Sequence, residues 1–395
     1  MILHDYLIIG GGLAADAAVA GIKSIMPDAD IGIVSEESDP PYNRPPLSKG
    51  LWDGFPLKFI WRGTEKRGVT LHLDRKAIHL DPQTQSITDD QNTVYSYKKL
   101  LLATGGSVRK LPLDTDTIIY YRTLEDYRQL KQRTENRDRF AVIGGGFIGS
   151  ELAAVLAKKS KKVIMLFPEE GILSRVLPQE LSLYLNQVYK QHNIEVMTGV
   201  IVRSLVEDQA VILKLDDDRA IEVDGAVAGI GVEARVELAV EAELKVDHGI
   251  VVDKHLCTTD PHIYAAGDVA RFYNPSLDKR IRLEHEDNAY MMGETAGKNM
   301  AGSSLVYHHL PSFYSQLFDN MYEAVGELDP RMETLTEWET PFQKGVVFYL
   351  NNQRVRGVLS WNAEGLMDAA RQLIQQSESV DTCFLKEWAQ RNINR

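Results

Sequence analysis

Two stretches with one shared pattern decide the fold: residues 6–21 read YLIIGGGLAADAAVAG and residues 140–155 read FAVIGGGFIGSELAAV. Each consists of a short apolar run, a glycine triplet and an alanine-rich segment with helical spacing. This order predicts a strand, a tight turn and a helix. The two copies start 134 residues apart, which is too far for the units of a solenoid. We therefore expect two separate α/β nucleotide-binding units.

The small residues of such a unit have distinct physical roles. The first glycine permits the tight turn, the second lets the backbone approach a pyrophosphate, and a small third residue lets the helix pack on the strand. Free N–H groups at the start of the helix then attract the phosphates. The three positions are Gly10, Gly12 and Ala15 in the first copy and Gly144, Gly146 and Gly149 in the second.

An acidic residue at the end of the next strand completes each unit, because a carboxylate there holds a ribose hydroxyl. In IGIVSEE, Glu36 follows Gly10 by 26 residues, and in VIMLFPEE, Glu169 follows Gly144 by 25 residues. The alternative is a pair of glycine-rich turns in an ordinary α/β sheet. Two complete units favour two dinucleotides, and we expect FAD together with a nicotinamide cofactor.

Length and composition narrow the class of protein. At ~100–200 residues per domain, 395 residues indicate two or three domains. The net charge of −12 argues against a globally basic nucleic-acid binder, and no apolar stretch reaches the ~18–20 residues of a membrane span. No signal peptide is evident, so we expect a cytoplasmic protein.

The cysteine count bears on the chemistry. Cys257 and Cys383 are the two cysteines of the sequence, and they lie 126 positions apart. This spacing excludes a CxxC redox pair and a cysteine-rich metal site. We expect no metal, and any redox chemistry must depend on a bound cofactor.

Further motifs resemble a known family. The runs PYNRPPLSKGLW (41–52), LLLATGG (100–106) and HIYAAGDVA (262–270) resemble landmarks of the pyridine-nucleotide flavoprotein reductases. Within that superfamily the chain looks like apoptosis-inducing factor and its bacterial relatives, beside the ferredoxin, rubredoxin and putidaredoxin reductases. This closer resemblance rests on LFPEEGILSRVLP (166–178), EHEDNA (284–289), YEAVG (322–326) and KGVVFYLNNQRVRGVLSWN (344–362). One departure is GVEAR (231–235), where the superfamily usually has a Gly-x-x-Pro-Asn pattern.

The resemblance implies an α/β architecture with two Rossmann-like domains and a smaller C-terminal α+β domain. The first unit is then a discontinuous FAD domain of residues 1–112 and 248–305, with an NAD domain of residues 113–247 inserted. The C-terminal domain covers residues 306–395. Two hairpins are expected, one at the acidic tip LDDDRA (215–220) and one around NNQ (351–353).

Three residues are implied to act in the chemistry. Lys49 resembles the lysine beside the flavin N5 atom, Glu151 resembles its ion-pair partner, and His285 resembles a histidine at the flavin edge. A fixed cation favours reduced flavin, because reduction adds negative charge. From the residues alone, a solvated lysine, a glutamate at a helix start and a core histidine stay open.

The resemblance assigns other residues to FAD. Arg44 is expected at the pyrophosphate, because a planar cation with five donors suits phosphate geometry. Asp268 is expected at a ribityl hydroxyl, with a helix N-cap as the alternative. Beside the turn residues of the first unit, the FAD set is Glu36, Glu37, Arg44, Lys49, Ala77, Arg122, Asp268, His285 and Tyr314.

The resemblance also assigns a set of residues to NAD. Phe147 is expected to cover the flavin face until NADH arrives, unless it is a core residue. Glu169 and Glu170 would repel a 2′-phosphate, which favours NADH over NADPH, although Arg175 lies close in the sequence. Beside the turn residues of the second unit, the NAD set is Phe147, Glu169, Arg175, Gly231, Glu284, Glu323 and Asn362.

The expected function is an FAD-dependent NADH oxidoreductase. Hydride passes from NADH to flavin N5, and electrons continue to an external acceptor such as an iron–sulfur protein, a quinone or another oxidant. The alternative is a slow NADH-responsive module that self-associates as a homodimer on reduction, as the resemblance to apoptosis-inducing factor suggests. The acidic balance argues against inheriting DNA binding, and we expect no stable membrane insertion.

Overall fold

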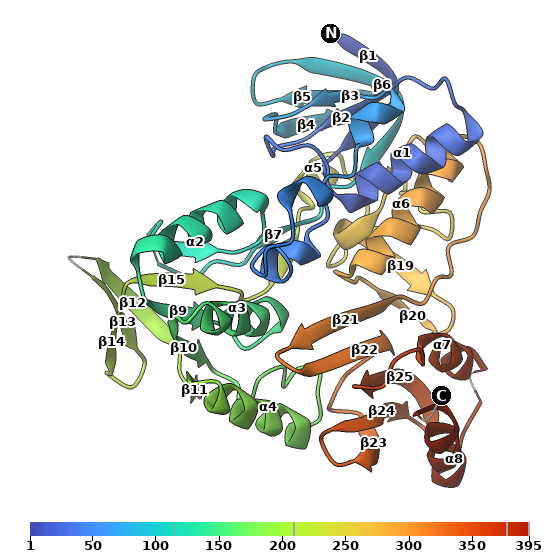
Figure 1. Cartoon of the computed structure of the whole chain (residues 1–395). Coiled ribbons are helices and arrows are strands. Elements are labelled where there is room, and N and C mark those ends of the chain that lie inside the picture. Colours follow the sequence, from blue (N-terminus) through green and yellow to red (C-terminus); the bar gives the residue numbers. More distant parts are fainter. Residues whose placement is uncertain (114, 208–209, 377, 394–395) are drawn as a thin grey trace. The chain divides into compact units, whose positions relative to one another are not determined.

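The computed structural model describes residues 1–113, 115–207, 210–376 and 378–393. The chain divides into two compact units, whose elements are labelled in Figure 1. The first comprises Met1–Asn43, Leu57–Ser107 and Glu233–Phe313, and the second comprises Arg44–Pro56, Val108–Val232 and Tyr314–Arg395. The mixed α/β class expected from the sequence is confirmed. The finer division into three domains stays a prediction.

A seven-stranded sheet forms the centre of the first unit, in the order β3-β2-β1-β6-β5-β4 with β18 beside β6. Five strands run parallel, whereas β4 and β5 form an antiparallel hairpin at one edge. Strands β2 and β18 and the last three residues of β1 and of β6 are buried and lack polar side chains other than a tyrosine, as is typical of strands covered on both faces. The strands are β1 (Ile2–Ile9), β2 (Ile31–Val34), β3 (Thr70–His72), β4 (Ala77–Asp81), β5 (Ser86–Asp89), β6 (Val94–Leu102) and β18 (Ile263–Ala265).

Helices α1 (Leu13–Ile25) and α6 (Glu286–Met300) pack closely in the first unit. A Cβ atom at Gly293 would lie 2.3 Å from the carbonyl oxygen of Ala14, and one at Gly297 would lie 2.2 Å from that of Ala18. The contact therefore requires residues without side chains, and it fixes the helix that follows the first glycine triplet. Other elements here are α5 (Glu237–Glu241), β17 (Ile250–Val251), β19 (Ala270–Asn274) and β20 (Lys279–Ile281).

The second unit contains a five-stranded parallel sheet in the order β11-β10-β9-β15-β8. Its strands are β8 (Ile118–Tyr120), β9 (Arg139–Ile143), β10 (Lys162–Phe167), β11 (Ile194–Thr198) and β15 (Gly225–Ala228). The helices are α2 (Leu124–Asn136), α3 (Phe147–Lys158) and α4 (Gln179–Gln191). An antiparallel sheet of β12 (Val202–Glu207), β13 (Val211–Leu215) and β14 (Ala220–Val223) shares one apolar core with this sheet. The hairpin predicted at LDDDRA is confirmed.

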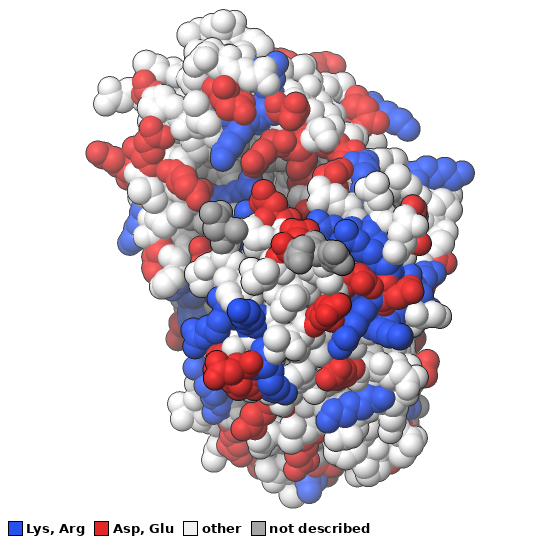
Figure 2. Space-filling model, turned by 90° about the vertical axis from the view of Figure 1, so that its left-hand side faces the viewer, with Lys and Arg blue, Asp and Glu red and all other residues white. Residues whose placement is uncertain are grey.

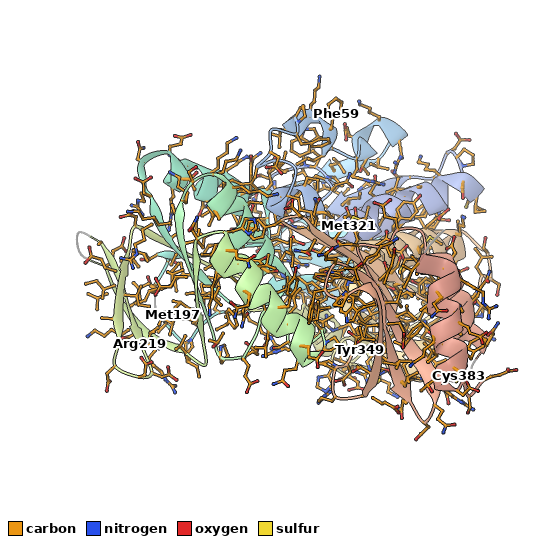
Figure 3. The ribbon with its side chains drawn as sticks, turned by 60° about the horizontal axis from the view of Figure 1, so that its bottom comes forward. Phe59, Met197, Arg219, Met321, Tyr349 and Cys383 are labelled. Carbon is orange, nitrogen blue, oxygen red and sulfur yellow. The ribbon has the colours of Figure 1, made fainter. Side chains whose placement is uncertain are left out.

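The second unit also contains a five-stranded antiparallel sheet in the order β21-β22-β25-β24-β23, with α7 (Met367–Gln376) and α8 (Thr382–Ile393) beside it (Figure 1). Its strands are β21 (Ser312–Leu317), β22 (Asn320–Gly326), β23 (Glu333–Thr340), β24 (Lys344–Asn351) and β25 (Arg354–Trp361). The hairpin predicted around NNQ is confirmed. The hydroxyl of Tyr349, labelled in Figure 3, donates to the carbonyl of Val176 at 2.6 Å and so ties this sheet to the segment after β10.

Two short strands, β7 (Gly106–Val108) and β16 (Val232–Ala234), each contain one of the sequence positions at which one unit ends and the other begins. Acidic and basic side chains intermingle on the face drawn in Figure 2.

Within the described ranges, no helix combines the length and apolar character needed to cross a membrane. The same residues contain no group of three or more His, Cys, Asp or Glu side chains arranged to hold a metal ion.

Candidate functional site

The turn after β1 has the geometry of a pyrophosphate cradle. Gly10 has a φ of +112°, and a Cβ atom there would lie 2.2 Å from the carbonyl oxygen of Ala103. Gly12 is the N-cap of α1, and a Cβ atom there would have no neighbour within 4 Å. Open space at the positive end of a helix suits an anionic phosphate, so these residues fit FAD. Ala15 is fully buried, as close helix packing requires.

The turn after β9 repeats this geometry in the second unit. Gly144 has a φ of +110°, and a Cβ atom there would lie 2.5 Å from the carbonyl oxygen of Gly229. A Cβ atom at Gly149 would lie 2.0 Å from the carbonyl oxygen of Gly144, whereas one at Gly146 would meet nothing within 4 Å. Phe147 is the first residue of α3. The second glycine triplet thus also leaves room for a phosphate at a helix start.

The acidic residue after β2 is part of an ion pair that sequence reasoning missed. Arg235 pairs with the Glu36 carboxylate, and both side chains are about half exposed. The backbone of Arg235 is held in turn by the segment after β6, because its N–H donates to the carbonyl of Gly105 at 3.0 Å. Arg235 ends the GVEAR run, whose departure from the superfamily pattern was the one available signal. The neighbouring Glu37 accepts a hydrogen bond from the Tyr42 hydroxyl at 2.5 Å.

The remaining first-unit residues occupy defined positions. Ala77 is the first residue of β4, and Asp268 lies in a short 3-10 helix, η4 (Gly267–Val269), directly after β18. Arg282 donates to the backbone carbonyl of Asp268 at 2.9 Å and forms an ion pair with Glu284 at 2.7 Å. Arg282 was not predicted from the sequence, and it connects the segments that carry two predicted cofactor contacts.

His285 is the N-cap residue of α6 and stacks on Phe313, with ring centroids 4.3 Å apart and planes 13° apart. Burial lowers the pKa of His285 to about 4, and the charges of Asp268 and Asp287 oppose this only in part. The imidazole is therefore neutral near pH 7, and it offers a ring surface and a hydrogen bond instead of a positive charge. This fits alignment of a hydride donor better than proton transfer.

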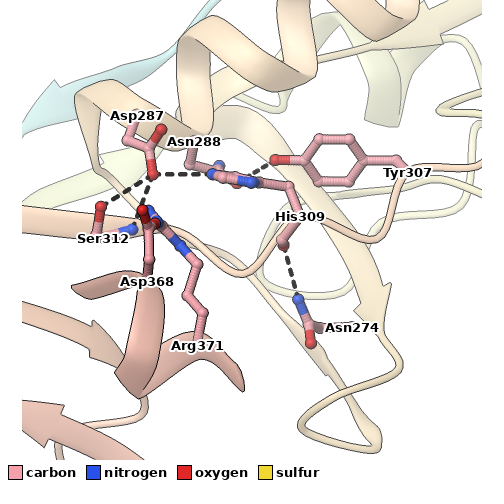
Figure 4. Close-up of polar contacts among 8 residues, drawn as sticks. All are labelled: Asn274, Asp287, Asn288, Tyr307, His309, Ser312, Asp368 and Arg371. Atoms are coloured by element: carbon pink, nitrogen blue, oxygen red, sulfur yellow. Dashed lines mark hydrogen bonds and ion pairs between the residues drawn. The ribbon is translucent and has the colours of Figure 1, made fainter. Parts of the chain in front are cut away.

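The segment before Phe313 is tied to the start of α6 (Figure 4). Asp287 accepts hydrogen bonds from the His309 ring at 2.8 Å and from the Ser312 backbone at 2.9 Å. The Tyr307 hydroxyl donates to Asn288 at 2.9 Å. These bonds hold Phe313 where it stacks on His285.

In the second unit, Lys49 and Glu151 form the ion pair that the resemblance implied. Lys49 Nζ lies 2.7 Å from Glu151 Oε1, and the glutamate is 4% exposed. The hydroxyls of Ser48 and Ser315 also donate to this carboxylate, each at 2.5 Å. The Tyr314 ring centroid lies 5.8 Å from Lys49 Nζ. The two serines were not among the residues predicted from the sequence.

The segment carrying Lys49 is anchored within the second unit. The carbonyl of Leu47 accepts hydrogen bonds from Tyr121 at 2.5 Å and from Trp52 at 2.8 Å. The Arg44 guanidinium donates to the backbone carbonyl of Arg122 at 3.1 Å, so the two arginines expected to contact FAD come from adjoining segments.

Apart from Glu284, which belongs to the first unit, the predicted NAD residues lie in different parts of the second unit. Glu169, just after β10, forms an ion pair with Arg175 at 2.6 Å, and Glu170 accepts from Gln179 at 2.9 Å. Gly231 has a φ of +102° and accepts a backbone hydrogen bond from Arg109.

Two weaker assignments lie in the C-terminal sheet. Glu323 is on β22 and pairs in register with Ser360 of β25. Both ends of the Asn362 side-chain amide are engaged, since it accepts from the Met321 N–H at 2.6 Å and donates to the Gln343 carbonyl at 2.7 Å. Asn362 therefore has a structural role, and its assignment to NAD stays a prediction.

Comparison with known proteins identifies relatives along the chain. Residues 4–293 match the family model described as pyridine nucleotide-disulphide oxidoreductase, and residues 336–376 match the one described as apoptosis-inducing factor, mitochondrion-associated, C-term. Apoptosis-inducing factor 1, mitochondrial, of Dictyostelium discoideum is 33% identical over 95% of this chain and 79% of the relative.

Reductases are similar to this chain as well. The ferredoxin–NAD(+) reductase component of the anthranilate 1,2-dioxygenase system of Burkholderia cepacia is 30% identical over 96% of each chain. The solved structure of the covalent putidaredoxin reductase–putidaredoxin complex aligns with a TM-score of 0.91 and 27% identity, over 97% of this chain and 95% of the other. The resemblance inferred from the motifs is confirmed.

Proposed function

This chain belongs to the pyridine nucleotide-disulphide oxidoreductase family and is an FAD-dependent oxidoreductase, and on that premise we propose that it delivers electrons from NADH to a separate iron–sulfur protein. When bound, FAD supplies a ring system that accepts hydride from a nicotinamide and gives up electrons to a further acceptor. The protein supplies binding, orientation and electrostatics.

One observation carries this proposal: two phosphate cradles occur in a chain whose cysteines, Cys257 and Cys383, lie 126 positions apart in the sequence and form no CxxC pair. The thiol of Cys257 contacts the carbonyls of Asp260 and Ile263, and burial raises its pKa, which disfavours a reactive thiolate. Electrons therefore leave for an external acceptor.

The class of acceptor is inferred from the relatives. A ferredoxin reductase component matches 96% of this chain, and the solved structure with a TM-score of 0.91 is a reductase bound to its protein partner. Ferredoxins carry iron–sulfur clusters. A quinone or a soluble oxidant is the alternative acceptor, and the rates of flavin reoxidation by each acceptor separate these possibilities.

The chain's own residues have the following proposed roles. Gly12 and Gly146 admit the phosphates of FAD and NADH to two helix starts. Lys49, held by its ion pair with Glu151, places an ammonium group where it stabilises negative charge on the reduced cofactor. His285, neutral and held by Phe313, aligns the cofactors.

The preference for NADH is proposed from Glu169. Its carboxylate suits a free ribose diol and repels a 2′-phosphate. Arg175 is 76% exposed and already pairs with Glu169, so part of its charge is compensated. This arrangement supports NADH over NADPH.

The test is an anaerobic titration with NADH followed by reoxidation. We expect one equivalent of NADH to bleach the flavin absorbance and a purified ferredoxin to restore it rapidly. Equal rates with ferredoxin, rubredoxin, quinone and oxygen would contradict a dedicated iron–sulfur acceptor. Failure of NADH to reduce the flavin would contradict the proposal as a whole.

A second function is favoured by one specific observation. The C-terminal sheet matches the apoptosis-inducing factor C-terminal model over residues 336–376. On this alternative the reduced protein turns over slowly and self-associates as a homodimer. Measurement of molecular mass before and after reduction decides it: a doubling with slow reoxidation by every acceptor supports the alternative.

A further inference from the structure

The Glu151 carboxylate receives three hydrogen-bond donors, two from the adjacent residues Ser48 and Lys49 and one from Ser315, so three segments of the second unit meet at this group. Ser48 belongs to the 3-10 helix η1 (Pro45–Ser48), Glu151 to α3 and Ser315 to β21. Lys49 Nζ lies 2.7 Å from Glu151 Oε1, and Ser315 Oγ donates to the same oxygen at 2.5 Å. Ser48 Oγ donates to Glu151 Oε2 at 2.5 Å. The side chains of Ser48, Glu151 and Ser315 are 3%, 4% and 1% exposed, so water does not replace these donors.

The donor set suits a carboxylate, because both oxygens of Glu151 accept a hydrogen bond from a serine hydroxyl. Burial raises the pKa of Tyr189 and of Tyr322 well above the usual value, and Glu151 adds to the effect in both.

The same arrangement restricts where the Lys49 ammonium can lie. Ser315 occupies one side of Oε1, which leaves Lys49 the other side. The residue before Ser315 is Tyr314, whose ring centroid is 5.8 Å from Lys49 Nζ. Two successive residues of β21 therefore adjoin the ammonium group, one through the carboxylate and one through its ring.

We propose that Ser315 is a positioning residue that sets the Lys49 ammonium group through Glu151, with Ser48 as its counterpart on the second carboxylate oxygen. This rests on the proposed function, in which Lys49 stabilises the reduced cofactor. Without Ser315, the carboxylate keeps one fixed oxygen and can rotate about it, and the ammonium group loses its defined place.

The experiment measures the midpoint potential of the bound flavin and the FAD-to-protein ratio in a set of variants. Ser315→Ala is expected to lower the potential in the same direction as Lys49→Ala but by less, with FAD retained. In the Lys49→Ala background, Ser315→Ala should cause no further shift, because its effect acts through the lysine. Ser315→Thr keeps the hydroxyl and should restore the wild-type potential.

The matched control is Ser182→Ala. Ser182 is also 1% exposed in the second unit, but its hydroxyl donates to the backbone carbonyl of Ile172 at 2.7 Å and not to Glu151. Ser182→Ala should leave the midpoint potential of the flavin unchanged. If Ser315→Ala does not fold, Ser48→Ala provides the same test from the other oxygen.

The outcomes separate this inference from the proposed function. An unchanged potential in Ser315→Ala, or shifts that add in the double variant, would overturn the positioning role while NADH still reduces the wild-type flavin. If wild-type protein is not reduced by NADH at all, the proposed function fails first. A shift in Ser182→Ala equal to that in Ser315→Ala would show a general packing effect and would also overturn the inference.

Discussion

Arg235 forms an ion pair with Glu36, although 199 positions separate the two residues in the sequence. Glu36 is the acidic residue expected to hold the ribose of FAD. A second such pair joins Arg175 to Glu169, the acidic residue of the other nucleotide-binding unit. In both units an arginine thus forms an ion pair with the carboxylate that is expected to bind the ribose.

We expect Arg235→Ala to weaken FAD binding because Glu36 loses the partner that orients it. A tenfold loss of affinity corresponds to ~1.4 kcal/mol. The melting temperature should change little, since exposed ion pairs contribute ~0–1 kcal/mol. Arg391→Ala removes the exposed pair with Glu387 and serves as the control. Equal FAD affinities in the two variants, measured by flavin fluorescence, would contradict this role.

Glu169 and Arg175 should affect cofactor choice in opposite directions. Glu169→Ala removes the group that repels a 2′-phosphate and frees Arg175 to bind it, so the ratio of kcat/KM for NADH over NADPH should fall by about tenfold, or ~1.4 kcal/mol. Arg175→Ala leaves the Glu169 charge uncompensated and should raise the ratio. Steady-state kinetics with both cofactors test this, and a ratio that moves the same way in both variants would disprove it.

Removal of Lys49 should change both the midpoint potential of the flavin and the stability of the chain. Lys49→Ala is expected to lower the flavin potential with FAD still bound. It should also destabilise the chain by ~1–3 kcal/mol, because the buried Glu151 charge loses a donor. The double variant Lys49→Ala/Glu151→Gln removes that unpaired charge and should regain stability without regaining the potential. Recovery of both quantities would indicate that the cation itself has no role.

The two glycines after β1 should respond differently to alanine. Gly10→Ala places a Cβ atom 2.2 Å from a backbone oxygen at a φ of +112°, so we expect ~3 kcal/mol or more of destabilisation. Gly12→Ala meets no atom within 4 Å and should fold normally but bind FAD more weakly. Thermal unfolding and FAD-to-protein ratios distinguish the two. Normal FAD affinity in Gly12→Ala would place the phosphates elsewhere.

The neutral state of His285 predicts a pH dependence of stability. Its pKa falls from 6.5 to about 4 on folding, so the unfolded chain binds the extra proton between these values. The free energy of unfolding should therefore decrease as pH falls from 6.5 towards 4, by at most ~3 kcal/mol from this residue. His285→Phe should flatten that decrease, whereas His79→Gln at the exposed pair with Glu241 should not. Parallel urea melts at pH 7 and pH 4.5 measure it.

Much of the nucleotide-binding architecture could be predicted from local sequence. The turn residues Gly10 and Gly144 have positive φ angles, and each glycine triplet is followed by a helix as expected. Such features depend on a few neighbouring residues, because backbone conformation and helix starts are short-range properties. The Lys49–Glu151 pair was reached through resemblance, since neither residue is distinctive alone.

The sequence by itself determined that this chain carries two strand–glycine–helix units, belongs among flavoprotein reductases and lacks a CxxC pair. Only the tertiary structure decided which groups surround the carboxylates: Arg235 at Glu36, the two serines at Glu151, and Phe313 at His285 through its ring. The physical reason is the separation along the sequence between the residues that must come into contact. A glycine turn needs its immediate neighbours, whereas the donors around a carboxylate come from segments that fold together across more than 100 positions, as between Ser48 and Glu151.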